Sequence, residues 1–185
     1  GFDPASLPHN YTIALGTPDL TMLELARGYT LLANGGYLAE PYLLARVETD
    51  RDGTIFTAQT TSSCTDCPTR QERSPGISQQ NWYQMYSMLQ DVILYGTAEK
   101  ARSLKRKDLA GKTGTTNDQR DAWFCGFNQH LLALSWVGFD SFQPLGKDET
   151  GGKTALPAWI RFMETALQGT ADDPPTPPAG LVSVR

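Results

Sequence analysis

This chain lacks several features that would place it in common functional classes. It has only three cysteines and two histidines in 185 residues, and they do not have the spacing of a four-ligand zinc site. Its net charge of −4 argues against a broad nucleic-acid-binding surface. No apolar run approaches the length of a transmembrane helix, and no signal peptide is visible. We therefore expect neither a bound metal nor a nucleic-acid partner.

What is present is the composition of an ordinary globular protein, with 39% hydrophobic and 19% charged residues. The length suffices for one domain or for a large part of one. The chain opens at Gly1 and closes with the strand-like run AGLVSVR. We interpret it as an internal piece of a longer polypeptide.

Two of the cysteines, Cys64 and Cys67, lie close together in the run SSCTDCPTR. A thioredoxin-type redox motif would follow a strand and open a helix, whereas this stretch is rich in Ser, Thr and Pro. Two interpretations stay open: a disulfide that staples the loop and implies an oxidising compartment, or a pair of free thiols. Cys125 lies in an apolar run, and we expect it to be a small buried hydrophobic residue.

The pattern of apolar and turn residues predicts helices around a meander of three strands. Helices are expected at residues 21–36, 78–96 and 154–169. The second should bury a stripe of Trp82, Met85, Tyr86, Leu89, Val92 and Ile93. A hairpin is expected at residues 41–59, with its turn at Asp52–Gly53. Helices before and after an antiparallel sheet predict the α+β class.

The string AGKTGTTND at residues 110–118 is the most informative stretch of the chain. A phosphate-binding loop would need a glycine where Arg106 stands, and it would open a helix. K-T-G alone carries little information, but here it precedes two strongly apolar strands. At the edge of a sheet, lysine would supply positive potential and threonine hydroxyls could bind a carboxylate. Glycine would permit close approach, and a backbone N–H could point at an oxyanion, which together suit acyl transfer.

In this context the sequence resembles the transpeptidase domain of the penicillin-binding proteins, most strongly the bifunctional class A members of the 1a type. That superfamily combines K-T-G with S-x-x-K and S-D-N. The resemblance spans nearly the whole chain and is carried by IALGTPDLTMLELARGYTLLANGGY, GKTGTTND, DAWFCGF, LSWVGFD, GGKTALPAWIRFMETAL and PPAGLVSVR.

The resemblance implies a five-stranded antiparallel sheet with helices on both faces, of which this chain supplies the last three strands and the final helix. No serine here is followed by lysine at the third position or by asparagine at the second. The S-x-x-K and S-x-N motifs are therefore absent. We expect residues 1–169 to be the C-terminal half of the transpeptidase domain, and residues 170–185 to be a Pro-rich linker and the start of a C-terminal extension.

Position by position, the resemblance implies that Lys112 is the K-T-G lysine, which would hydrogen-bond to the S-x-N serine. Thr113 and Thr115 would bind the terminal carboxylate of the substrate or of a β-lactam. Gly114 would let the substrate lie alongside the strand. The N–H of Thr115 would be one of two oxyanion donors, and Thr116 is a neighbour with a weaker claim.

The implied activity is peptidoglycan D,D-transpeptidation through a serine acyl-enzyme, without metal or organic cofactor. The implied partners are stem peptides and lipid II, β-lactams, the rest of the polypeptide and periplasmic activator proteins. The implied location is the periplasmic face of the bacterial inner membrane, which would favour a Cys64–Cys67 disulfide. Two alternatives remain: a D,D-carboxypeptidase or serine β-lactamase, and a non-catalytic β-lactam-sensing or scaffolding module.

Overall fold

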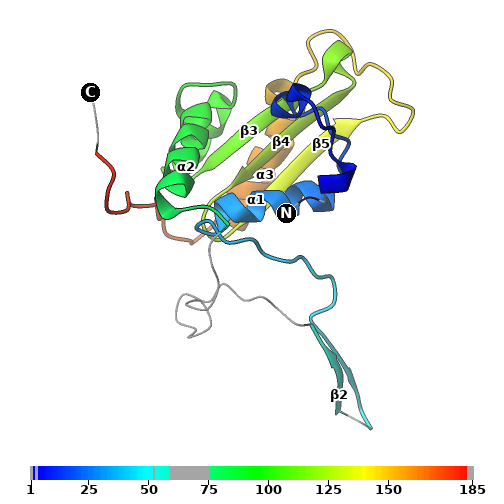
Figure 1. Ribbon diagram of the computed structural model, residues 1–185, viewed down its shortest axis with the longest axis vertical. Helices are drawn as coiled ribbons and strands as arrows, with labels where there is room; N and C mark the ends of the chain where they lie inside the picture. The colour runs from blue at the N-terminus through cyan, green and yellow to red at the C-terminus, as the bar shows by residue number, and fades with distance from the viewer. Residues whose placement is uncertain (1, 3, 52, 59–75, 183–185) are drawn as a thin grey trace.

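A three-stranded antiparallel sheet forms the centre of the protein (Figure 1). The computed structural model describes residues 2, 4–51, 53–58 and 76–182. The sheet contains β3 (Ala110–Thr115), β4 (Asp121–Phe127) and β5 (Leu132–Gly138), in that order. It confirms the predicted meander. The expected Cys64–Cys67 pairing lies outside the described residues.

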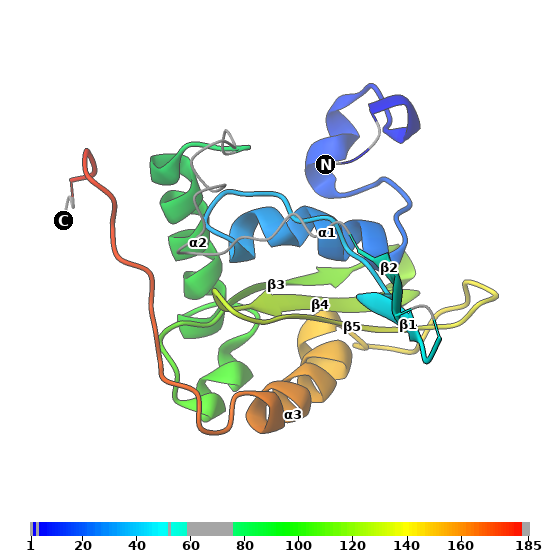
Figure 2. The same ribbon diagram turned by 90° about the horizontal axis from the view of Figure 1, so that it is seen from below.

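Helices cover both faces of this sheet (Figure 2). Helices α1 (Met22–Ala33) and α2 (Gln79–Leu94) lie on one face, and α3 (Leu156–Ala166) lies on the other. A two-stranded hairpin of β1 (Arg46–Thr49) and β2 (Gly53–Thr57) projects away from the sheet (Figure 1). No helix in the described part of the chain combines the length and apolar character needed to cross a membrane.

The sequence sets the start of α1 through a reciprocal cap. The Thr21 hydroxyl accepts a hydrogen bond from the Glu24 N–H at 3.2 Å, and the Glu24 carboxylate accepts one from the Thr21 N–H at 2.8 Å. Two otherwise unpaired backbone donors are thereby satisfied. The expected helix is confirmed, ending at Ala33 where residues 34–36 turn the chain.

Helix α2 packs against the sheet through a narrower stripe than the sequence suggested. Its buried residues are Trp82, Tyr86, Leu89 and Ile93. Met85 was expected in this stripe but is 40% exposed. The buried positions recur at intervals of four, three and four residues, which is one line along a helix, and Met85 lies at its margin.

Side chains of β4 on the two faces of the sheet belong to two separate hydrophobic cores. Ala122 and Phe124 belong to a cluster with Trp159 and Met163 of α3. Phe127 packs with Tyr86 and other residues on the opposite face of the sheet. A Cβ at Gly126 would lie 2.5 Å from the Trp159 ring, so glycine is needed where this indole packs against the sheet.

Candidate functional site

The K-T-G residues form β3, which lies at one edge of the described sheet. All six β3 residues pair with β4 in a single unshifted register. One step beyond the strand, the Thr116 N–H donates to the Asp121 carbonyl at 3.2 Å. Since antiparallel hydrogen bonding alternates along a strand, Lys112 and Gly114 direct their backbone groups to β4 as Thr116 does. Thr113 and Thr115 therefore direct theirs away from β4, toward the outer edge.

The side chains of β3 divide between the two faces of the sheet. Thr113 pairs with Phe124 and Thr115 pairs with Ala122, and both of these β4 residues pack toward α3. Lys112 pairs with Cys125, whose side chain contacts Tyr29 of α1. The two threonine hydroxyls thus share one face, and the lysine side chain leaves from the other.

The lysine ammonium nevertheless returns to the outer edge of β3. The Lys112 Nζ donates to the Thr113 carbonyl oxygen at 2.8 Å, and the side chain is exposed. This contact agrees with the outward direction of the Thr113 backbone. Positive charge and the outward N–H of Thr115 therefore lie along the same edge.

Both threonine hydroxyls have partners outside the strand. The Thr113 Oγ1 lies 2.6 Å from the Thr97 Oγ1, in the turn that follows α2. The Thr115 Oγ1 accepts a hydrogen bond from the Gly151 N–H at 3.0 Å. Gly151 begins a π-helical turn, Gly151–Ala155, that leads into α3. Sequence reasoning identified the two β3 threonines but missed Thr97 and Gly151.

Gly151 can lie here only because it has no side chain. A Cβ at this position would meet the backbone carbonyl oxygens of Trp123 and Gly114, the latter at 2.6 Å. Backbone atoms cannot swing aside as a flexible side chain can, so the turn packs directly onto the β3–β4 pair. The adjacent glycines in GGKTA were a signal of such close approach in the sequence.

Thr116 takes part in the turn between β3 and β4. Its hydroxyl oxygen accepts a hydrogen bond from the Asp121 N–H at 2.8 Å. Together with the bond from the Thr116 N–H to the Asp121 carbonyl, this contact closes the turn. Thr116 thus stabilises the turn at the end of β3. Its contact with a ligand remains a prediction.

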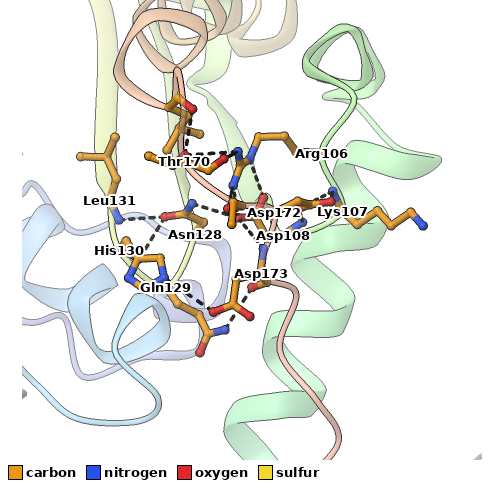
Figure 3. A network of polar contacts seen from close by, with 12 residues as sticks. Arg106, Lys107, Asp108, Asn128, Gln129, His130, Leu131, Thr170, Asp172 and Asp173 are labelled. Carbon is orange, nitrogen blue, oxygen red and sulfur yellow. Dashed lines mark hydrogen bonds and ion pairs between the residues drawn. The ribbon is translucent and has the colours of Figure 1, made fainter. Parts of the chain in front are cut away.

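A buried polar network holds the start of β3 (Figure 3). The Arg106 guanidinium donates to both Asp108 carboxylate oxygens, at 2.8 and 2.6 Å. Asn128, in the β4–β5 turn, donates to Asp108 at 3.0 Å. From α2, the Tyr86 hydroxyl donates to the Asp108 carbonyl at 2.6 Å. The network therefore ties β3 to its neighbouring turn and to α2.

The same network fixes the segment that follows α3. Arg106 also donates to the carbonyl oxygens of Thr170 and Ala171, at 2.9 and 2.6 Å. The Asp172 carboxylate accepts hydrogen bonds from the backbone N–H groups of Lys107 and Asp108, both at 3.0 Å. Figure 3 shows Asp172 and Asp173 beside the start of β3. Residues 170–172, which follow α3, are thus hydrogen-bonded to residues 106–108 at the start of β3.

The surroundings of Asp108 and Cys125 shift the pKa values of both groups. Burial by itself would raise the pKa of the Asp108 carboxyl, but hydrogen bonds led by that from Arg106 outweigh it and hold this pKa below its ordinary value. Burial raises the pKa of the Cys125 thiol to about 12. Cys125 is thus a neutral core residue, as expected. In the described residues no cluster of three or more His, Cys, Asp or Glu side chains could hold a metal ion.

Comparison with known proteins places these features in a family. The sequence matches the penicillin binding protein transpeptidase domain over residues 6–140. It is 38% identical to penicillin-binding protein 1A of Pseudomonas aeruginosa, over 100% of this chain and 27% of that protein. It is 39% identical to penicillin-binding protein 1A of Neisseria gonorrhoeae, over 99% of this chain and 22% of that protein. The chain thus spans about a quarter of the length of these relatives.

A solved structure shows the same fold. The crystal structure of penicillin-binding protein 1A from Haemophilus influenzae superposes with a TM-score of 0.82 and 32% sequence identity. The match covers 96% of this chain and 31% of that one. It confirms the predicted α+β fold, with helices on both faces of an antiparallel sheet.

Proposed function

Since the chain belongs to the penicillin-binding protein transpeptidase family, we propose that it is the substrate-binding half of a peptidoglycan D,D-transpeptidase. The observation that carries this proposal is the outer edge of β3. The Lys112 ammonium and the outward N–H of Thr115 lie along this edge, and the hydroxyls of Thr113 and Thr115 lie on one face of the same strand. Such an edge suits a peptide that ends in a carboxylate and passes through an oxyanion.

In the proposed reaction a serine hydroxyl from outside this chain attacks the penultimate D-Ala carbonyl of a stem peptide. The carbonyl oxygen becomes an oxyanion, toward which the Thr115 N–H donates. The C–N bond breaks, and D-Ala leaves after its amine takes up the proton that the serine hydroxyl lost. An amine of a neighbouring stem then attacks the acyl-enzyme and forms the cross-link, and the serine oxygen leaves and takes up the proton that this amine lost.

The last four residues of β3 each have a defined part in this scheme. Thr113 and Thr115 donate hydroxyl hydrogen bonds to the terminal carboxylate, and Lys112 adds positive charge and hydrogen-bonds to the serine of the S-x-N motif. Gly114 has no side chain that would hold the substrate off the strand. These groups bind and polarise the peptide, and the serine supplies the nucleophile, so the reaction needs no metal or organic cofactor.

The whole protein is proposed to be a bifunctional glycosyltransferase and transpeptidase that uses lipid II. Its preceding sequence would carry the glycosyltransferase, the two missing serine motifs and an anchor in the inner membrane. Residues 1–169 would then complete the transpeptidase domain on the periplasmic side, followed by a linker and a C-terminal extension. β-Lactams would acylate the same serine, and periplasmic activator proteins would bind elsewhere on the polypeptide.

The decisive test is Lys112→Ala in the full-length protein, assayed by acylation with fluorescent penicillin. We expect acylation to fall by about 100-fold or more, because removing one preorganised electrostatic group typically costs about 10²–10³ in rate. Lys107→Ala is the matched control, since Lys107 is also exposed but lies before β3. Near-normal acylation of Lys112→Ala would overturn the assignment.

Two further measurements separate the alternatives. Residues 1–185 alone, incubated with a β-lactam, should show no added mass because the nucleophile is missing. A covalent adduct would reveal a nucleophile within this chain. If the full-length protein passes its acyl group only to water even when an amine acceptor is present, it is a carboxypeptidase or β-lactamase. If a stem peptide acylates the full-length protein but the acyl group is never released, the protein is a sensing or scaffolding module.

A further inference from the structure

We propose that Thr97 is a positioning residue, which orients the Thr113 hydroxyl so that it donates a hydrogen bond to the substrate carboxylate. The inference rests on the proposed function of β3. It starts from the Thr97–Thr113 contact, in which the two hydroxyl oxygens lie 2.6 Å apart and either one can be the donor. Thr97 is 16 residues away in sequence and belongs to a different element.

The direction of this hydrogen bond decides what Thr113 can bind. A hydroxyl has one proton, and a carboxylate only accepts hydrogen bonds. If the Thr113 hydroxyl donates its hydrogen bond to Thr97, it has no hydrogen left to donate to the carboxylate. If Thr97 is the donor, Thr113 accepts that hydrogen bond and can donate its own to the ligand. A ligand carboxylate therefore selects the arrangement in which Thr97 donates.

Thr115 shows the same arrangement with its direction already fixed. Its partner, the Gly151 N–H, can only donate, so the Thr115 Oγ1 must accept. The Thr115 proton is thereby directed to another acceptor. On the α3 face of β3, two hydroxyls two residues apart thus each have a hydrogen-bond partner outside the strand. Same-face neighbours on a strand are separated by roughly 6.7 Å, which lets each hydroxyl point at one oxygen of a single carboxylate.

The turn that carries Thr97 is held firmly against the site. Ala98 is fully buried, and its N–H donates to the Val92 carbonyl at 3.0 Å. A Cβ at Gly152 would lie 2.6 Å from the Thr97 carbonyl oxygen. Thr97 is therefore packed against the turn before α3 while its own side chain stays exposed. Backbone packing thus positions the hydroxyl that contacts Thr113.

The experiment measures acylation of the full-length protein by a penicillin that carries a carboxylate. Thr97→Val keeps the shape and removes the donor, and we expect a loss of about tenfold in acylation, as for one hydrogen bond between neutral groups at the upper end of the usual range. The loss should fall mainly on the apparent affinity, with a smaller change in the maximal acylation rate. Thr97→Ser keeps the hydroxyl and should retain activity within about twofold. Thr165→Val, an exposed threonine on α3, should behave as the unaltered protein.

A double-mutant cycle tests whether Thr97 acts through Thr113. Thr97→Val added to Thr113→Val should cause little further loss, because the hydroxyl it orients is already gone. Additive losses, or a serine variant as defective as the valine variant, would overturn the positioning role, as would normal acylation of Thr97→Val. Failure of the proposed function has a different signature: the unaltered protein is not acylated, or Lys112→Ala is acylated normally.

Discussion

Replacing Asp108 with asparagine is expected to lower the free energy of unfolding of the transpeptidase domain by about 3 kcal/mol. The Asp108 side chain is fully buried and its partner Arg106 is 11% exposed, with 2.6 Å between the charged atoms. Removing one partner of a buried ion pair costs about 3–5 kcal/mol, because the other charge is left without compensation. Arg106 would keep its contacts with the carbonyl oxygens of Thr170 and Ala171, which places the loss at the lower end.

Asparagine cannot repair this network although it has nearly the same shape as aspartate. Both Arg106 and Asn128 donate hydrogen bonds to the Asp108 carboxylate. An amide presents one acceptor oxygen and one NH₂ group, so a donor would meet a donor. The expected structural consequence is a loosened start of β3 together with release of residues 170–173.

The assay is hydrogen exchange on the full-length protein, read locally at β3 and at residues 170–173. A local measurement is needed because a multidomain protein does not unfold in one two-state step. Glu99→Gln is the control, since it breaks the Arg102–Glu99 pair, which has a similar distance of 2.9 Å but side chains 57% and 63% exposed. Such an exposed pair contributes about 0–1 kcal/mol.

The pH dependence gives a second test of the same reasoning. Because the Asp108 pKa is lowered in the folded protein, its charge stabilises the fold above the ordinary aspartate pKa of about 3.9. That contribution is lost as the pH falls through the lower, folded-state value. The difference between the unaltered protein and Asp108→Asn should therefore be full at pH 7 and should narrow below about pH 4. Loss of less than about 1 kcal/mol at pH 7, or no coupling to Arg106→Met in a double-mutant cycle, would refute the role assigned to this pair.

Two other predictions concern the two faces of the sheet. Cys125 should resist alkylation by iodoacetamide at pH 8 in the folded protein, because with a pKa of about 12 only about one thiol in ten thousand is ionised. Mass spectrometry with and without denaturant measures the labelling of this residue. Equal labelling in both states would contradict the buried position. Gly151→Ala should lower penicillin acylation by about tenfold or more, because the added methyl group would push the turn away from β3 and remove the hydrogen bond to Thr115. Lys153→Ala replaces an exposed residue of the same turn and should have little effect. Normal acylation of Gly151→Ala would show that this hydrogen bond is not needed.

The sequence by itself determined the features that depend on neighbours along the chain. The Thr21–Glu24 cap is written in residues three apart, so the start of α1 was predictable. Two apolar runs joined by a short polar turn predicted β4 and β5 of the meander. K-T-G, together with the flanking runs that resemble the family, identified β3 as the strand that carries the site.

Only the tertiary structure decided which distant groups meet at that strand. Thr97 and Gly151 lie 16 and 36 residues from their partners, and the Arg106 network joins residues 64 and 65 apart. Met85 was misplaced because periodicity gives the direction of an apolar face but the width of the contact depends on the opposing sheet. A hydroxyl and a backbone N–H have no pattern in sequence that names their partners. Their pairing arises when the packing of α2 and of the turn before α3 against β3 brings these groups within hydrogen-bond distance.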